Sequence, residues 1–222
     1  MPLTRFLEYN ISSDTINSTH INNKFACLLE SKTEFVAVSV SPALIESVGV
    51  AIGDLDITIS SVLRCGTYIE VLMLECAMAI ENGAEEIEVI VDLNGAEIDE
   101  IYEIKGELAI LKDEIEADAL LKVDISLNNL TSEDQTQDIV SNICSSGADF
   151  IVLNLANLEN TKILEFALTE IKKESLKQGR QIGVKYKCTV NEEEIISLTE
   201  KILGRAWLTP DLLRIERTFS TI

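Results

Sequence analysis

Charged side chains alternate with apolar ones in three short segments of the sequence that are rich in Val, Ile and Leu. Alternate residues of a β-strand point to opposite faces, so each segment would have one apolar face and one charged face. The charged positions are Glu86, Glu88, Asp92, Lys122, Asp124, Lys185 and Lys187. If these strands close into a barrel, inner positions this polar should form a solvated or ion-paired pocket near the strand ends.

Two interpretations of the three lysines are open from the residues alone. A second cation close to Lys185, such as Lys187, would lower the pKa of the Lys185 amine in a partly desolvated cavity and make it a nucleophile. Lys122 could take the same role. Alternatively, the lysines pair with the carboxylates on neighbouring strands in an ion network that only satisfies buried charges. Carboxylate oxygens can also bind a hard cation such as Mg²⁺. Lysines in the same cavity would repel such an ion, so we expect no metal. We also expect no cofactor.

Eight segments have the length and composition of buried parallel strands, and they alternate with segments of helical periodicity. The expected strands cover residues 35–40, 55–60, 87–92, 120–125, 150–155, 182–187, 206–208 and 212–215. The expected helices cover residues 15–30, 42–48, 68–81, 97–115, 132–145, 161–177 and 192–203. This alternation predicts one α/β domain over residues 1–222, a TIM barrel. Residues 216–222 leave room for only a short last helix or none.

The composition excludes several classes of function. The chain has 38 acidic and 18 basic residues, a formal net charge of −20, which disfavours nucleic acid and anionic membrane surfaces as partners. No membrane-length apolar run or signal peptide is recognisable, so we expect a cytoplasmic protein. His20 is the only histidine, which excludes imidazole metal clusters and serine triads. The five cysteines form no CxxC pair and are expected to be free thiols.

Five segments of the sequence are similar, in the same order, to segments typical of the deoxyribose-phosphate aldolase family. They are AVSVSP at 37–42 (family AVCVNP), AIENGAEEIE at 79–88 (AVENGADEID), LLKV at 120–123 (LLKV), GADFI at 147–151 (GADF) and GVK at 183–185 (GVK). These segments extend over most of the chain. The sequence therefore resembles a divergent member of this family.

The resemblance implies a class I aldolase, which joins acetaldehyde to glyceraldehyde 3-phosphate through a lysine Schiff base and without a metal. The family's nucleophilic lysine corresponds to Val152 in this sequence. The lysine that helps to keep the nucleophile's pKa low corresponds to Lys185, and the aspartate that assists proton transfer corresponds to Glu88. Because Val152 has no amine, the resemblance implies a catalytically degenerate member of the family.

The segments that match the family's phosphate-binding loops are also altered. The glycine pair after the GVK strand is replaced by Cys188 and Thr189, whose side chains would block close approach of a phosphate to the backbone. The final GxSS loop corresponds to residues 216–219, where Glu216 would repel an anion and Arg217 would offset this only in part. The GFPLG loop corresponds to residues 61–65. We therefore do not expect a phosphorylated substrate.

Three functions remain open from the sequence. The first is a degenerate family member that binds a small carbonyl ligand or regulates a partner. The second is an aldolase or lyase that uses Lys185 or Lys122, with Glu88, on a carbonyl substrate without phosphate. The third is a non-catalytic interaction protein, paired with an active paralogue. A homo-oligomer is possible in each case.

Overall fold

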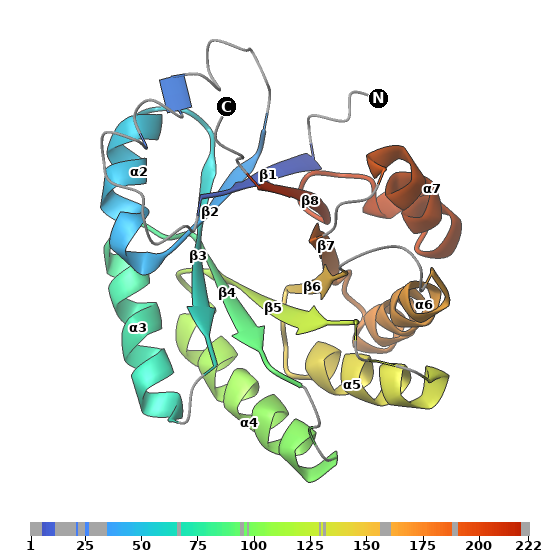
Figure 1. The fold of residues 1–222 in the computed structure, drawn as a ribbon. Helices are drawn as coiled ribbons and strands as arrows, with labels where there is room; N and C mark the ends of the chain where they lie inside the picture. The colour runs from blue at the N-terminus through green and yellow to red at the C-terminus, as the bar shows by residue number, and fades with distance from the viewer. Residues whose placement is uncertain are drawn as a thin grey trace.

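The computed structural model describes residues 6–11, 21, 25–26, 35–65, 68–93, 96, 98–128, 130, 132–155, 161–187 and 191–218. Eight parallel strands close into a barrel in chain order, and β8 pairs with β1 (Figure 1). The strands are β1 (Leu7–Asn10), β2 (Ala37–Val40), β3 (Thr58–Arg64), β4 (Glu86–Val91), β5 (Leu120–Ser126), β6 (Phe150–Asn154), β7 (Gly183–Lys187) and β8 (Leu213–Thr218). The expected fold class, a single-domain α/β TIM barrel, is confirmed.

The helices lie outside the barrel, between successive strands (Figure 1). They are α2 (Ile45–Ile52), α3 (Ile69–Glu81), α4 (Ile98–Ile115), α5 (Glu133–Ser145), α6 (Thr161–Gln178) and α7 (Glu192–Ile202), with short 3-10 helices η2 (Pro42–Leu44) and η4 (Arg205–Trp207). The helix expected over residues 15–30 falls mainly outside the described residues. The described part of the chain ends with β8 at Thr218, and no helix within it is long and apolar enough to cross a membrane.

Local sequence signals account for several element boundaries. The Ser132 side chain accepts a 3.2 Å hydrogen bond from the Gln135 backbone N–H and caps the start of α5. The Asn191 side chain caps α7 in the same way, by accepting from the Glu193 N–H at 3.1 Å. Gly147 has a φ of 94°, a conformation that suits glycine and that turns the chain from α5 into β6.

One expected strand is wrong and one strand was missed. Residues 206–208 do not form a strand, because Arg205–Trp207 form η4 and the Trp207 indole N–H donates to the Ile182 carbonyl oxygen at 2.9 Å. The eighth strand is instead β1, near the N-terminus. The sequence signal for β1 is weak, because the strand is only four residues long and polar side chains occupy two of its positions, Glu8 and Asn10.

The expected strand over residues 55–60 is displaced along the chain. The strand β3 begins at Thr58 and continues to Arg64, so Asp56 precedes it and is exposed rather than lining the barrel. Most of the segment that matches the family's GFPLG loop, residues 61–65, is therefore strand. The apolar part of this segment, at Leu63, is buried, which explains why it extends the sheet.

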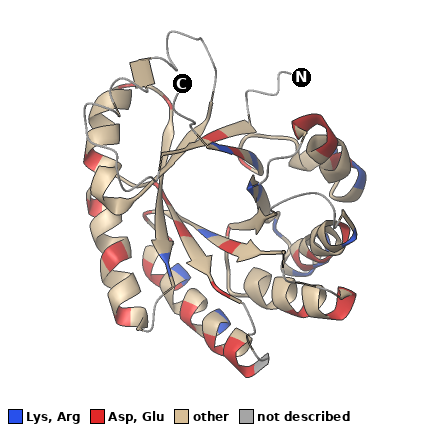
Figure 2. Ribbon diagram, in the orientation of Figure 1, with Lys and Arg blue, Asp and Glu red and all other residues tan. Residues whose placement is uncertain are grey.

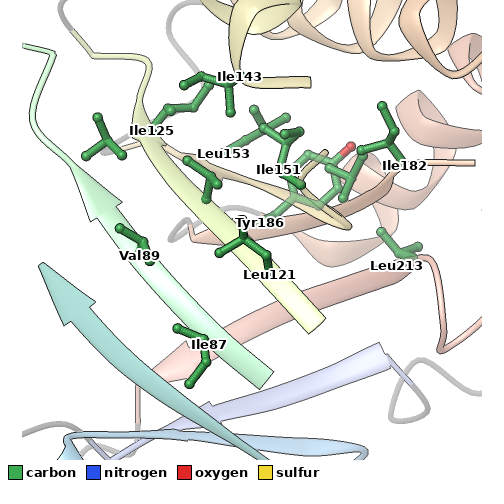
Figure 3. Packing of buried hydrophobic residues seen from close by; sticks show 14 of the residues in the cluster. Ile87, Val89, Leu121, Ile125, Ile143, Ile151, Leu153, Ile182, Tyr186 and Leu213 are labelled. Atoms are coloured by element: carbon green, nitrogen blue, oxygen red, sulfur yellow. The ribbon is translucent and has the colours of Figure 1, made fainter. Parts of the chain in front are cut away.

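The apolar face of each strand packs against the surrounding helices, as the period of two predicts. Val89, Leu121 and Ile151 are fully buried on this outer face (Figure 3). The Tyr186 hydroxyl reaches α7, where it hydrogen bonds with the Thr199 hydroxyl at 2.7 Å. This apolar layer fixes the strand orientation, so the alternate, mostly polar residues must point into the barrel lumen.

Candidate functional site

The inner faces of the strands bring together a cluster of buried charges, which we call the lumen network. Its members are Glu8, Glu86, Glu88, Lys122, Asp124, Lys185, Lys187, Arg214 and Glu216. Figure 2 shows acidic and basic positions on neighbouring strands around the lumen. Strand pairing aligns these positions, since Glu88 lies beside Lys122 and Lys185 lies beside Arg214. The inward orientation of the charged side chains of β4, β5, β7 and β8 therefore follows from the alternation of side chains along each strand.

Lys185 lies at the centre of this network and is fully buried. Its Nζ atom lies 2.6 Å from Glu8 Oε1, 2.6 Å from Glu88 Oε2 and 2.8 Å from Glu216 Oε2. It also donates to the Ser39 hydroxyl at 2.9 Å, and that hydroxyl donates in turn to Glu8. The amine thus has three carboxylates and one hydroxyl around it.

These contacts set the protonation state of the network. Burial lowers the pKa of Lys185, but the carboxylates of Glu8, Glu88 and Glu216 outweigh it and hold the pKa well above the ordinary value of 10.5. Burial raises the pKa of Glu8, but Lys122 and Lys185 bring it far below 4.5. The pKa of Glu88 is lowered in the same way, because Lys185 and Lys187 outweigh its burial. These contacts favour the ion-network interpretation of Lys185 over the alternative interpretation, which requires a lowered pKa.

Lys122 occupies the side of the network nearer the amino-terminal ends of the strands. Its Nζ atom lies 2.9 Å from Glu8 Oε2 and also forms an ion pair with Glu86. The ring of Phe150 lies 5.6 Å from the same atom, measured to the ring centroid. Arg214 completes this region, with its Nη2 atom 3.5 Å from Glu86 Oε1. Lys122 is fully buried, so a substrate would have to displace these partners to reach it.

Lys187 is the last residue of β7, at the carboxyl end of the barrel where TIM-barrel active sites lie. Its Nζ atom lies 2.7 Å from Asp124 Oδ2 and forms a second ion pair with Glu88. Burial lowers its pKa, but Glu88 and the other carboxylates raise it overall. Burial raises the pKa of Asp124, and Lys187 offsets this only in part. The Lys187 side chain is 12% exposed, so it is more accessible than Lys122 or Lys185.

The structure confirms that the lysines pair with carboxylates in the lumen, but the residues that take part differ in part from those expected. Asp92 was expected to belong to it, but this residue follows β4 and is exposed. Glu8 was missed altogether, because the strand that carries it was missed. Glu216 and Arg217 were expected in a phosphate loop, whereas both lie in β8. Cys188 and Thr189, the other residues of that expectation, lie outside the described residues.

Val152, where the family resemblance places the Schiff-base lysine, lies inside the barrel wall and is fully buried. On β6 it is in register with Asp124 of β5 and Lys185 of β7. No amine is available at this position, and the amines around it are engaged with carboxylates. Among the described residues, no group of three or more His, Cys, Asp or Glu side chains is placed to hold a metal ion.

The fold and the lumen define the chain as a TIM barrel with an ion-paired interior, and solved aldolases share this fold. A protein provisionally named deoxyribose-phosphate aldolase from Toxoplasma gondii ME49 superimposes with a TM-score of 0.79 and 22% identity, over 98% of this chain and 88% of that chain. The tetrameric deoxyribose phosphate aldolase from Aeropyrum pernix gives a TM-score of 0.69 and 16% identity, over 97% and 86%. The chain therefore resembles deoxyribose-phosphate aldolases in fold.

The sequence comparisons show that this similarity in fold comes with little similarity in sequence. No protein-family model matches the chain, and no curated protein matches it in sequence. A structure described as "QR15, an Aldolase" also has only 17% identity, with a TM-score of 0.71 over 98% of this chain and 91% of that chain. At these identities the likeness establishes the architecture, and function has to be argued from the side chains of the lumen.

Proposed function

We propose that this chain is a non-catalytic barrel with an aldolase-like fold, in which the lumen network stabilises the strands and the function lies in binding. One observation carries the proposal. Val152 is buried where the family resemblance puts the Schiff-base lysine, while Lys185 beside it is held by three carboxylates. A protein of this kind has the architecture of the enzyme without a free amine for its chemistry.

The alternative, an aldolase or lyase that uses Lys185 or Lys122, finds little support in these contacts. Imine formation needs an uncharged amine whose lone pair faces a carbonyl carbon. The raised pKa of Lys185 keeps this amine protonated at neutral pH. Lys122 is fully buried between Glu8 and Glu86, so a carbonyl substrate would have to separate an ion pair before it could react. Glu88, expected to assist proton transfer, accepts instead from Lys185.

Reductive trapping tests the proposal directly. The protein is incubated with acetaldehyde or 2-deoxyribose 5-phosphate and borohydride, and modified lysines are located by mass spectrometry. We expect no adduct on Lys122, Lys185 or Lys187 above the level of an exposed lysine such as Lys201. Acetaldehyde release from 2-deoxyribose 5-phosphate, followed with a coupled dehydrogenase, should equal the rate without protein.

A stoichiometric adduct on a lumen lysine, together with turnover that Lys185→Ala or Lys122→Ala abolishes, would overturn the proposal and identify the nucleophile. The Lys201→Ala variant is the matched control, because this lysine pairs with Glu165 at 3.3 Å on the surface. Its loss should leave both the adduct and the turnover unchanged.

We also propose that the protein is cytoplasmic. We further propose that it binds neither nucleic acid nor anionic membrane surfaces, because a formal charge of −20 repels both. A small carbonyl ligand held without covalent chemistry is compatible with this role. A homo-oligomer is a further part of the proposal, supported by the tetramer described for the Aeropyrum pernix protein. Sedimentation velocity over a range of protein concentrations tests this part, and a single monomeric species throughout would contradict it.

A further inference from the structure

Helix α3 and the residue that precedes it expose four large apolar side chains. They are Tyr68, Val71, Leu74 and Met78, and we call them the α3 stripe. Each of them is between 54% and 67% exposed. The spacing of Val71, Leu74 and Met78 places these three in one row on the helix, and Tyr68 is the N-cap residue at its start. The buried face of the helix is formed by Leu72, Cys76 and Ala79. An exposed apolar row on a helix marks an interaction site more often than scattered single residues do.

A hollow adjoins one end of the α3 stripe. Tyr68 and Val71 line it together with Pro42, Leu72 and the end of β3, and its volume is about 440 Å³. This volume lies within the range of sites that hold ligands or anchor side chains. The row therefore adjoins an open hollow whose volume is large enough to take one large apolar side chain of a partner.

The charges around the α3 stripe are almost all negative. Helix α3 carries Glu70, Glu75 and Glu81 and has no Lys or Arg, and α2 carries only Glu46. Figure 2 shows acidic positions but no basic ones along both helices. Among the described residues that line the hollow, Arg64 is the one basic residue. The surface thus pairs an apolar row with acidic flanks.

A second copy of this chain is a poor occupant of the surface. Symmetric contact between two α3 helices would bring the glutamates of one copy, Glu70, Glu75 and Glu81, close to those of the other, which is repulsive. The basic part of α6 offers only one exposed large apolar residue, Leu176 at 73% exposure. Its neighbours Lys173 and Lys177 already pair with glutamates of α6.

Helix α4 is no better suited to the surface. It exposes Tyr102 and Ile110, but acidic residues outnumber basic ones along it. The described residues therefore supply no helix that combines an apolar row with an excess of basic side chains.

We infer that the α3 stripe binds an amphipathic helix of a partner protein that carries an apolar face flanked by Lys and Arg. One large apolar residue of that helix enters the hollow, and the remaining apolar face covers Leu74 and Met78. Basic side chains beside this face pair with Glu70, Glu75 and Glu81. This is recognition of a helix in a groove, in which spaced anchors provide affinity and charges provide specificity. An anionic membrane does not fit, because the acidic flanks repel it.

The test uses a labelled synthetic peptide of Leu and Lys, about 18 residues long so that its helix is stable enough in isolation. Two control peptides are used. One has the same composition in scrambled order, and the other has Glu in place of every Lys. Fluorescence anisotropy should show that the amphipathic Leu–Lys peptide binds at least tenfold more tightly than either control. Hydrogen exchange should slow in residues 68–81 when this peptide is bound.

Variants of the protein locate the site. Leu74→Ser with Met78→Ser should weaken peptide binding at least tenfold, and Glu75→Lys should weaken it and reduce its salt dependence. The matched control is Leu176→Ser, which removes a similarly exposed apolar residue from α6 and should leave binding unchanged. Circular dichroism and urea unfolding verify that each variant is folded.

Three results would overturn the inference. The first is equal peptide binding to the parent protein and to the Leu74→Ser, Met78→Ser variant, which would mean adsorption to the acidic surface. The second is self-association that this variant abolishes, since the occupant would then be a second copy. The third is co-sedimentation of the protein with anionic phosphatidylserine vesicles that depends on Leu74 and Met78, which would make the surface a membrane contact.

Discussion

Replacing Lys185 with Met tests whether the lumen network stabilises the barrel. The change removes the amine and keeps an unbranched, flexible side chain. In the parent protein the amine lies within 2.8 Å of carboxylate oxygens from Glu8, Glu88 and Glu216. The variant leaves these carboxylates crowded without their shared cation, so they must repel one another, take up protons or admit water.

The magnitude follows from the geometry of the site. Removal of one partner of a buried ion pair costs roughly 3–5 kcal/mol, because the other partner is left as an uncompensated buried charge. Lys122 still contacts Glu8, and Lys187 still contacts Glu88, which offsets part of the loss. We therefore expect a loss of about 3 kcal/mol in the free energy of unfolding. For a chain of this size it corresponds to a fall of roughly 6–12 °C in Tm.

Urea unfolding followed by circular dichroism measures the loss. The matched control is Lys201→Met, because Lys201 pairs with Glu165 at the surface. An exposed pair of this kind contributes about 0–1 kcal/mol. The loss in the free energy of unfolding is compared between the two variants. The difference between the two losses gives the effect of burial on the cost of removing a lysine amine.

The pH dependence gives an independent check. The pKa values of Glu8 and Glu88 lie below 4.5 in the folded protein, so their stabilisation is present above that pH and is lost as the pH falls through the lower folded values. The pKa of Lys185 lies above 10.5, so its contribution is present below that pH and is lost in stronger alkali. The difference in the free energy of unfolding between the parent protein and the Lys185→Met variant should be largest between about pH 6 and 9. It should become smaller as the pH falls into the acid range.

Two results would refute this account of the network. One is a loss below about 1 kcal/mol for Lys185→Met, the size expected of a surface pair. The other is a difference from the parent protein that stays constant down to pH 3, because the carboxylates would then not depend on this cation. Adding Glu88→Gln to the variant should recover part of the stability, since it removes one of the crowded charges.

Three further predictions concern other buried groups. Val152→Lys alone should give no acetaldehyde release in a coupled dehydrogenase assay, because nearby carboxylates keep the new amine protonated; family-like turnover would contradict this. Burial raises the pKa of the Cys76 thiol to about 12, so a disulfide reagent at pH 8 should label Cys76 only after unfolding, and rapid labelling of the native protein would be inconsistent with this structure. Tyr186→Phe removes the 2.7 Å hydrogen bond with Thr199 and should cost about 0.5–1.5 kcal/mol in urea unfolding, whereas an unchanged midpoint would show that this bond contributes nothing.

Much of the architecture was predictable from the sequence, because alternation along each strand is a local property. The period of two in residues 120–125 places Lys122 and Asp124 on one face, and a charged face can be accommodated only in a lumen or in water. The same reasoning directs Glu88 and Lys185 inward. The errors fall where the local signal is weak or misleading, as in the short strand that carries Glu8 and in the apolar run at residues 206–208.

By itself, the sequence determined that three lysines point into the barrel and that no lysine stands at position 152. Only the tertiary structure decided what surrounds them. The visible neighbour of Lys185 along the chain is Lys187, a like charge, which predicts a lowered pKa. Barrel closure brings Glu8, 177 residues away in the chain, and Glu216 against the same amine and reverses the sign of the shift. Coulomb interactions depend on distance in space, so the closed barrel, which brings carboxylates of β1, β4 and β8 around Lys185, decided the protonation state of the site.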